Sequence, residues 1–358
     1  MPFHPFINQR VQKYLDQKRP FKESGPTRKI RLHANENGIG SPSLQWYHRF
    51  TEDEDMEQFK LAIAGIKNVP KENLFITNGK YYFFELCIRI FCEAEKDKII
   101  FCTPVPDELM DLAKLNGIDY LKVPLTSDQQ LDMIHLEKVV NEETKLIWLS
   151  SPNHFTGNNM HHEDIETILN NFSGLVILDE SYINFSKHRS FLPELKEYPN
   201  LCICQNFHYA WGMAGLEVEI AFASVDIISI LNQLPFSKHL NKPTMEIIRD
   251  ALQNIQDVNS NIKTIVAMRN AMGRELEHFS FIDKVYSSDA NFLLIKFNNI
   301  PLVKEYLKVN QIEIHDLTQE KFYEHCLRIS IGSEREIKSL LDVFENIELK
   351  LSENVPDK

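Results

Sequence analysis

Short apolar runs alternate with amphipathic segments over the first two thirds of the chain. Runs rich in β-branched and aromatic residues occur at 73–77, 98–102, 120–123, 145–150, 175–179, 201–205 and 218–224. Helical patterns of apolar residues occur at 56–68, 81–91, 108–116 and 163–171. Near-continuous apolar strands that alternate with helices predict an α/β domain, in which helices cover both faces of a mainly parallel sheet.

The pattern changes after Leu240. A long helical stretch at 243–279 leads into a smaller unit with strands at 291–297, 312–315 and 327–331 and helices at 302–309 and 334–347. We therefore predict an irregular N-terminal arm (1–50), a large domain (51–245), a connecting helix (246–280) and a small α+β C-terminal domain (281–358).

Composition and charge narrow the classes of function. The chain has 358 residues, of which 43% are hydrophobic and 25% charged, as expected for a globular protein with two domains. A net charge of −12 argues against nucleic-acid or anionic-membrane partners, although a local basic pocket can still bind a small anionic ligand. No run approaches the about 18–20 apolar residues of a membrane span, and the N-terminus lacks a signal-peptide pattern.

The six cysteines lie in apolar runs and form no CxxC pair. Cys202 and Cys204 alternate on one face of a predicted strand. This distribution is typical of reduced core thiols in a cytoplasmic protein, and we predict no metal site.

Residues that follow the predicted strands are the candidates for a site, because open α/β sheets bind ligands beyond the carboxyl ends of their strands. Gly79 opens a helix, where backbone N–H groups can face an anion, although any tight turn can use a glycine. Asn153 lies in a segment that its Pro/Asn/Gly composition predicts to be a turn, and it can present its amide to a ligand. Asp179 ends a buried strand, where its carboxylate needs a partner or caps the next segment.

Six motifs stand in chain order: R-L-H-A-N-E-N at 31–37, S-P-N-H-F-T-G at 151–157, D-E-S-Y at 179–182, A-G-L at 214–216, A-N-F at 290–292 and L-R-I-S at 327–330. Together they resemble the fold-type I PLP-dependent aminotransferases, and most of all the histidinol-phosphate aminotransferase family. The resemblance covers most of the chain. It implies a three-layer PLP-transferase-like large domain, a small α+β domain, PLP as cofactor and a homodimer.

The resemblance also assigns roles to single residues. It implies that Asp179 binds the pyridine nitrogen of PLP, and that Tyr182 and Asn153 bind the ring oxygen. It places Gly79 beside the cofactor phosphate. Arg328 holds the anionic end of the substrate, and Asn35 also lies in the substrate site.

Other positions depart from the family pattern. Tyr209 stands where the family has its Schiff-base lysine, and a phenol with a reference pKa of about 10 cannot form an imine. Glu217 replaces an arginine, and His208 a serine, that bind the cofactor phosphate. Pro106, Phe50 and His315 stand at or near a ring-stacking aromatic residue, a tyrosine that reaches the partner subunit's phosphate, and a second arginine, respectively.

Lys80 stands where the family has a small or hydroxylated residue beside the phosphate. Since Glu217 is an acid where the family has a base, we hypothesise that Lys80 and Glu217 form an ion pair that fills the phosphate position. The alternative is that both charges are solvated and never meet.

Three interpretations stay open. The first is a pseudoenzyme, an aminotransferase by ancestry with a degenerate PLP site, which acts as a ligand-binding or regulatory homodimer and binds PLP weakly or not at all. The second is an active aminotransferase for an amino acid or amino-alcohol phosphate, with PLP bound non-covalently or by Lys242; a surface lysine is the alternative for that residue. The third is a dimeric interaction protein with aromatic residues such as Trp46, Tyr47 and Trp211 at its interface.

Overall fold

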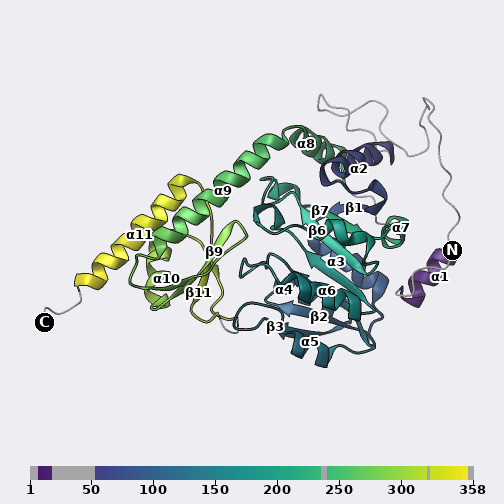
Figure 1. Cartoon of the computed structure of the whole chain (residues 1–358), viewed down its shortest axis with the longest axis horizontal. Helices are drawn as coiled ribbons and strands as arrows, with labels where there is room; N and C mark the ends of the chain where they lie inside the picture. Colours follow the sequence, from purple (N-terminus) through teal and green to yellow (C-terminus); the bar gives the residue numbers. More distant parts are fainter. Residues whose placement is uncertain (1–6, 18–52, 235–239, 321–322, 354–358) are drawn as a thin grey trace.

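The computed structural model describes residues 7–17, 53–234, 240–320 and 323–353 (Figure 1). Asn35, Phe50 and the motif at 31–37 lie outside these residues, so their predicted roles stay predictions. The predicted division of the chain into domains also stays a prediction.

A seven-stranded sheet forms the centre of the larger part. Its strands are β1 (Leu74–Asn78), β2 (Lys98–Thr103), β3 (Asp119–Pro124), β4 (Thr144–Ser150), β5 (Leu175–Asp179), β6 (Leu201–Asn206) and β7 (Val218–Ala223). They lie in the order β1-β7-β6-β5-β4-β2-β3. All neighbours are parallel except β7, which runs antiparallel to both β6 and β1. The predicted mainly parallel sheet is confirmed.

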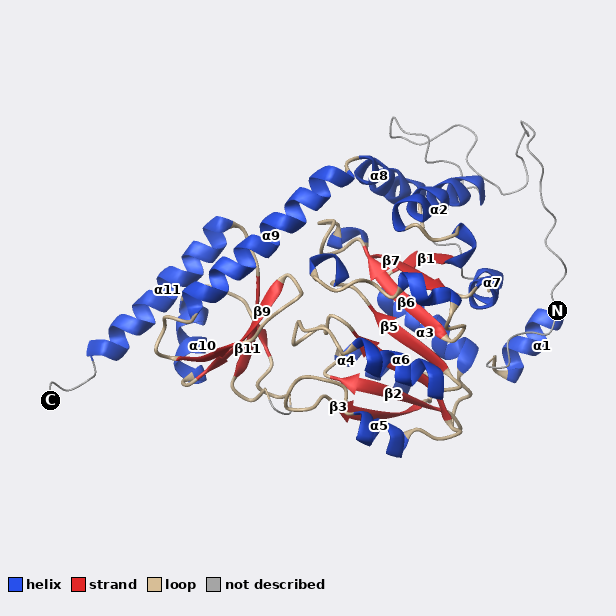
Figure 2. Ribbon diagram, viewed as in Figure 1, coloured by secondary structure: helices blue, strands red, loops and turns tan. Residues whose placement is uncertain are grey.

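Helices cover both faces of this sheet (Figure 2). They are α1 (Gln9–Gln17), α2 (Asp53–Lys67), α3 (Lys80–Phe91), α4 (Asp107–Leu115), α5 (Met133–Val139), α6 (His162–Asn171) and α7 (Val225–Gln233). Short 3₁₀ turns lie at Lys71–Asn73, Ile183–Phe185, Leu192–Lys196 and Ala214–Leu216.

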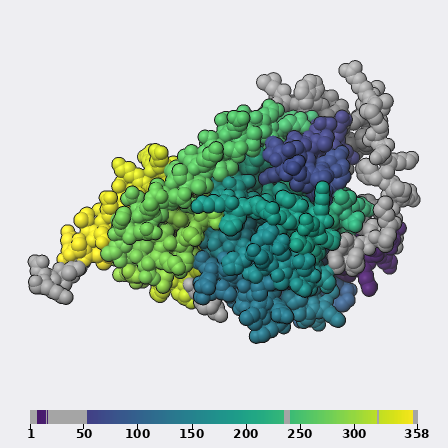
Figure 3. All heavy atoms as spheres, in the orientation of Figure 1, coloured from purple at the N-terminus to yellow at the C-terminus, as the bar shows by residue number. Residues whose placement is uncertain are grey.

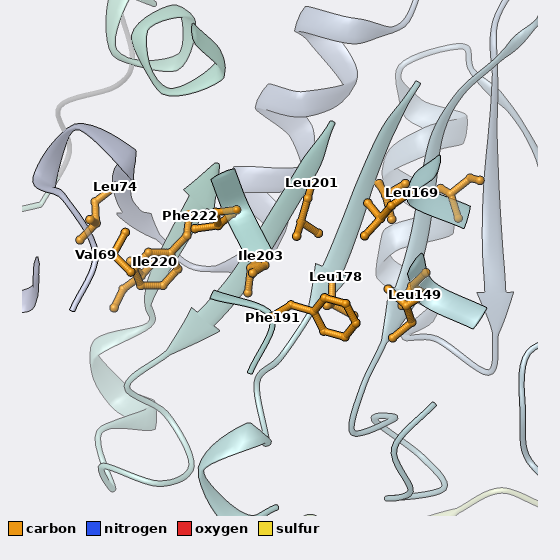
Figure 4. Packing of buried hydrophobic residues seen from close by; sticks show 14 of the residues in the cluster. Val69, Leu74, Leu149, Leu169, Leu178, Phe191, Leu201, Ile203, Ile220 and Phe222 are labelled. Carbon is orange, nitrogen blue, oxygen red and sulfur yellow. The ribbon is translucent and has the colours of Figure 1, made fainter. Parts of the chain in front are cut away.

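The sheet buries apolar side chains on each face, because successive residues of a strand point in opposite directions. Leu178, Ile203 and Phe222 lie in the core on one face (Figure 4), whereas Ile177 and Cys202 lie in the core on the other. Burial on both faces explains why these strands appear in the sequence as near-continuous apolar runs. All six cysteines are free and buried.

A four-stranded antiparallel sheet forms the smaller part. It contains β8 (Ile282–Val285), β9 (Phe292–Phe297), β10 (His315–Asp316) and β11 (Cys326–Ser330), in the order β10-β11-β9-β8. The helices are α8 (Lys242–Gln253), α9 (Ile255–Leu276), α10 (Ile300–Val309) and α11 (Glu334–Glu353), and α9 lies beside α11 (Figure 1).

Three predicted elements of this part differ from the structure. The helix predicted at 243–279 is two helices that meet at Asn254, where φ is −102° and ψ is 33°. β8 was not predicted, because Asp283 and Lys284 leave it without an apolar run. The strand predicted at 312–315 shrinks to β10, because the amide of Ile312 donates to Leu307 O at the end of α10.

The two sheets meet at the carboxyl ends of the central parallel strands, where the smaller part packs against the larger (Figures 1 and 3). The Asn159 amide donates to Asp289 across this boundary (2.7 Å), and the Asp289 amide donates to Gly157 O (2.7 Å). The predicted site residues Asn153, Asp179 and Arg328 therefore lie near this boundary between the two parts. Within the described ranges, no helix is long and apolar enough to span a membrane.

Candidate functional site

Asp179 ends β5 and is the most fully bonded acid of the site. Its side chain is 1% exposed. Oδ1 accepts hydrogen bonds from the amide (3.0 Å) and hydroxyl (2.5 Å) of Ser181, and Oδ2 accepts one from Lys80 Nζ (2.5 Å). Asn206 at the end of β6 donates to the Ser181 hydroxyl (2.9 Å) and so fixes its orientation. Both oxygens of this buried carboxylate therefore have partners within the chain.

Lys80 is the first residue of α3 and is 8% exposed. Gly79 precedes it with φ of +83°, and a Cβ there would lie 3.4 Å from Glu217 O, so a glycine suits this turn. Burial opposes the charge of Lys80, but Asp179 and then Glu219 outweigh that effect and raise the pKa of its ammonium above the ordinary value.

The predicted ion pair between Lys80 and Glu217 is wrong. Lys80 turns into the protein toward Asp179, whereas Glu217 is exposed at the end of a 3₁₀ turn, with φ of 50° and ψ of 39°. The buried carboxylate of Asp179 attracts the ammonium of Lys80 more strongly than the exposed carboxylate of Glu217 does, because water screens an exposed charge.

Glu219 is a residue of the site that the sequence analysis missed. It lies on β7 opposite Thr77 of β1 and Asn206 of β6, and it is 0% exposed. Burial raises the pKa of its carboxyl well above the usual value, although the charge of Lys80 opposes the change. A single acid within the apolar run at 218–223 was the signal that could have identified it.

Tyr209 and Tyr182 stack on each other, with ring centroids 4.5 Å apart and planes inclined by 17°. The hydroxyl of Tyr182 lies 3.1 Å from His154 Nδ1. Burial, followed by the charge of Lys80, lowers the pKa of both His154 and His208, for His208 to about 4. Both imidazoles are therefore neutral at pH 7, and the aromatic wall of the site carries no charge.

Asn153 uses its side chain mainly within its own turn. Its Oδ1 accepts hydrogen bonds from the amides of Phe155 (2.9 Å) and Thr156 (3.1 Å), and its Nδ2 donates to Pro104 O (3.3 Å). The turn predicted from composition is thus observed, and the oxygen of Asn153 closes it. One N–H of its amide group has no bond here, since the group has two donors.

Arg328 on β11 brings a cation from the smaller part into the site. It donates to His154 O (2.7 Å), and its guanidinium lies 5.1 Å from the ring centroid of Phe292 and 5.5 Å from that of Phe155. Among the residues that the structure describes, no carboxylate forms an ion pair with Arg328. A half-buried guanidinium beside neutral groups can accept an anion.

The remaining candidates lie at the edge of this cluster or away from it. The His315 ring is 5.4 Å from that of Phe155, and Pro106 precedes α4. The ammonium of Lys242 lies 3.4 Å from Asp55 on α2 and is largely exposed. No group of three or more His, Cys, Asp or Glu in the described part of the chain is arranged to hold a metal ion.

Comparison with known proteins places this arrangement in a family. The family model for class I and II aminotransferases matches residues 45–344. The histidinol-phosphate aminotransferase of Cytophaga hutchinsonii is 36% identical over 319 residues, which are 89% of this chain and 91% of that protein. The histidinol-phosphate aminotransferase of Flavobacterium johnsoniae is 32% identical over 326 residues, 91% of this chain and 92% of that protein. The chain belongs to the class I and II aminotransferase family.

Solved structures agree with the aminotransferase fold. The histidinol-phosphate aminotransferase from Clostridium acetobutylicum has a TM-score of 0.75 at 19% identity, and the match covers 83% of this chain and 90% of that one. The enzyme from Sinorhizobium meliloti, solved in complex with pyridoxal-5'-phosphate, has a TM-score of 0.75 at 17% identity, and covers 89% and 90%. The fold class predicted from the sequence is confirmed.

Proposed function

We propose that this chain is a non-catalytic member of the aminotransferase family that binds a small anionic ligand. The observation that carries the proposal is the position of Tyr209. The resemblance to the family implies that Tyr209 stands at the position of the Schiff-base lysine. The ring of Tyr209 stacks on that of Tyr182, with ring centroids 4.5 Å apart. Since a phenol cannot form an imine, the covalent link to PLP has no donor at this position.

The other side chains of the site also fit PLP poorly. A protonated pyridine nitrogen would need an oxygen of Asp179, but both oxygens already accept hydrogen bonds, Oδ2 from the ammonium of Lys80 and Oδ1 from Ser181. Glu217 brings a negative charge next to Gly79, where the resemblance places the phosphate, and like charges repel. His208 is neutral and adds no charge to offset it. We therefore expect PLP to bind weakly or not at all.

Arg328 supports the ligand-binding part of the proposal. Its guanidinium is half-buried, and its neighbours His154, Phe155 and Phe292 carry no negative charge. A guanidinium in such surroundings favours a carboxylate or phosphate, with which it forms charge-assisted hydrogen bonds. We propose a small carboxylate or phosphate ester as ligand, held by a cytoplasmic homodimer with a binding or regulatory role.

An active aminotransferase is the alternative. In it another lysine would bind PLP, and Lys242 was the candidate from the sequence. Its ammonium lies against Asp55 at the protein surface. Lys80 is the lysine inside the site, but its ion pair with Asp179 keeps its amine protonated, and a protonated amine is not a nucleophile. Neither lysine favours the alternative.

Absorbance and mass spectrometry test the proposal together. The purified full-length protein is mixed with PLP, the visible absorbance of an imine is recorded, and borohydride reduction is followed by mapping of adducts. We expect no imine band and no adduct above that of a denatured control. A stoichiometric adduct on Lys80 or Lys242 would overturn the proposal and identify the replacement amine.

A further inference from the structure

Lys80 occupies a position that is unfavourable for a cation. It is the first residue of α3, and the N-terminus of a helix carries a partial positive charge. Its ammonium is also buried, with 9% of the side chain exposed. Two electrostatic effects therefore oppose a charged lysine here, and the contact with Asp179 must offset both.

Asp179 has its charge balanced by the chain alone. Ser181 and Asn206 orient the carboxylate from one side through a chain of hydrogen bonds, and this arrangement leaves Oδ2 directed at Lys80. Glu219 is fully buried on the neighbouring strand β7 and forms no ion pair with Lys80, whose ammonium contacts Asp179. The buried cluster thus contains one cation and one anion in direct contact.

We propose that Lys80 is a built-in substitute for the cationic ring nitrogen of the cofactor, and that its contact with Asp179, more than the change at Tyr209, excludes the pyridine ring. This inference rests on the proposed function, because it explains how a site of this ancestry stays closed to PLP. Lys80 is thereby the residue that determines specificity against the cofactor.

Competition explains why the substitution is effective. A pyridinium ring that approaches Oδ2 of Asp179 meets the ammonium of Lys80 there, and two cations at one carboxylate repel each other. An ammonium that the ring displaced would remain buried beside a helix N-terminus. Breaking a buried pair in this way is costly, whereas the tethered lysine binds without loss of translational freedom. Restoring a lysine at position 209 supplies an amine but does not remove this competitor.

Three variants distinguish the effect of Lys80 on ring binding from that of Tyr209. They are Lys80→Ser, Tyr209→Lys and the double variant Lys80→Ser/Tyr209→Lys. Binding of pyridoxine, which has the ring but neither aldehyde nor phosphate, is measured by quenching of protein fluorescence. We expect Lys80→Ser to bind pyridoxine about 100-fold more tightly than the wild type, and Tyr209→Lys to bind it as weakly as the wild type. With PLP and borohydride, the double variant gains an adduct at position 209 that Tyr209→Lys lacks.

Matched controls keep the test decisive. Lys80→Met/Asp179→Asn removes both charges and should fold without gaining affinity for pyridoxine, since the anion is gone. If Lys80→Ser is too unstable for the binding assay, its thermal unfolding is followed in methylammonium or pyridinium chloride. Either cation should raise the melting temperature of Lys80→Ser and leave that of the wild type unchanged, and sodium chloride at equal ionic strength is the reference.

Distinct results would overturn the inference. The first is that Lys80→Ser binds pyridoxine no more tightly than the wild type does. The second is that Lys80→Ser and Lys80→Met/Asp179→Asn bind pyridoxine equally well. The third is that Tyr209→Lys forms a PLP adduct as complete as that of the double variant. An unfolded Lys80→Ser that neither cation stabilises would also overturn it. Failure of the proposed function looks different, because it appears as an adduct in the wild-type protein.

Discussion

Two neighbouring acids at the end of β5 point to opposite faces of the sheet and have contrasting surroundings. Asp179 contacts an ammonium directly, through Lys80. Glu180 accepts hydrogen bonds from the hydroxyl of Ser190 (2.5 Å), the amide of Phe191 (2.7 Å) and the side chain of Gln205 (2.8 Å). A lysine, Lys67, is also near Glu180, but it reaches the acid only through Gln205, whose Oε1 lies 2.6 Å from its Nζ.

The pKa values of the two lysines shift in opposite directions. Burial lowers the pKa of Lys67 to about 8, and the more distant charge of Glu180 offsets only part of that effect. The pKa of Lys80 is raised, because Asp179 and Glu219 outweigh its burial. Burial also raises the pKa of Glu180. A lysine and an acid therefore form a direct ion pair on one face, whereas on the other face a glutamine lies between them.

The largest expected effect comes from breaking the direct pair. Lys80→Met leaves the carboxylate of Asp179 buried without its cation, and we expect a loss of about 3–5 kcal/mol in the free energy of unfolding. Urea unfolding followed by circular dichroism measures it. Lys80→Met/Asp179→Asn should recover most of the loss. If the free energy of unfolding of Lys80→Met lay within about 1 kcal/mol of the wild-type value, this would contradict a tight ion pair between Lys80 and Asp179.

Lys67→Met is the matched change on the other face, and we expect it to alter stability by only about 1 kcal/mol at pH 7. The pH dependence sharpens the comparison. The unfolded lysine keeps its proton up to about pH 10.5, whereas the folded one loses it near pH 8. The unfolded state thus binds more protons in this window, so the stability of the wild type relative to Lys67→Met rises with pH.

The slope of that rise is at most about 1.4 kcal/mol per pH unit. Denaturant unfolding of both proteins at pH 7.5, 8.5 and 9.5 measures the difference and cancels the titration of other groups. A flat difference would show that Lys67 titrates normally, and the contrast between the two lysines would then be lost.

The smallest effect concerns Glu217. Since it is exposed and Lys80 binds Asp179, Glu217→Gln should leave the free energy of unfolding within about 0.5 kcal/mol of the wild type. The amide keeps the size of the side chain, so the turn is preserved. A loss comparable to that of Lys80→Met, measured in the same urea titration, would revive the pairing of Lys80 with Glu217.

The sequence alone predicted most of the fold. All seven strands of the large sheet appeared as apolar runs. Six of them are buried over most of their length, which leaves no polar alternation to obscure the run, whereas the edge strand β3 is mainly exposed. The exposed edge strand β8 was missed and the end of β10 misplaced, because neither has such a run. Local pattern thus identifies buried elements more securely than exposed ones.

The candidate site was predicted in part. Asp179, Tyr182, His208 and Tyr209 follow their strands in sequence, and the carboxyl ends of β5 and β6 bring them together. The sequence could also show that Lys80 and Glu217 were unusual. It could not show the partner of Lys80, since that depends on which side of α3 the lysine turns to and how well each acid is shielded from water.

Residue identity by itself determined the alternation of strands and helices, the order of the motifs and the tyrosine at position 209. Only the tertiary structure decided which charges meet. Asp179 and Lys80 are 99 positions apart in sequence yet in direct contact, whereas the adjacent acids Asp179 and Glu180 are separated by the sheet. The reason is physical: apolar burial follows local periodicity, whereas the strength of a charge pair depends on distance and exclusion of water, which the packing of remote segments sets.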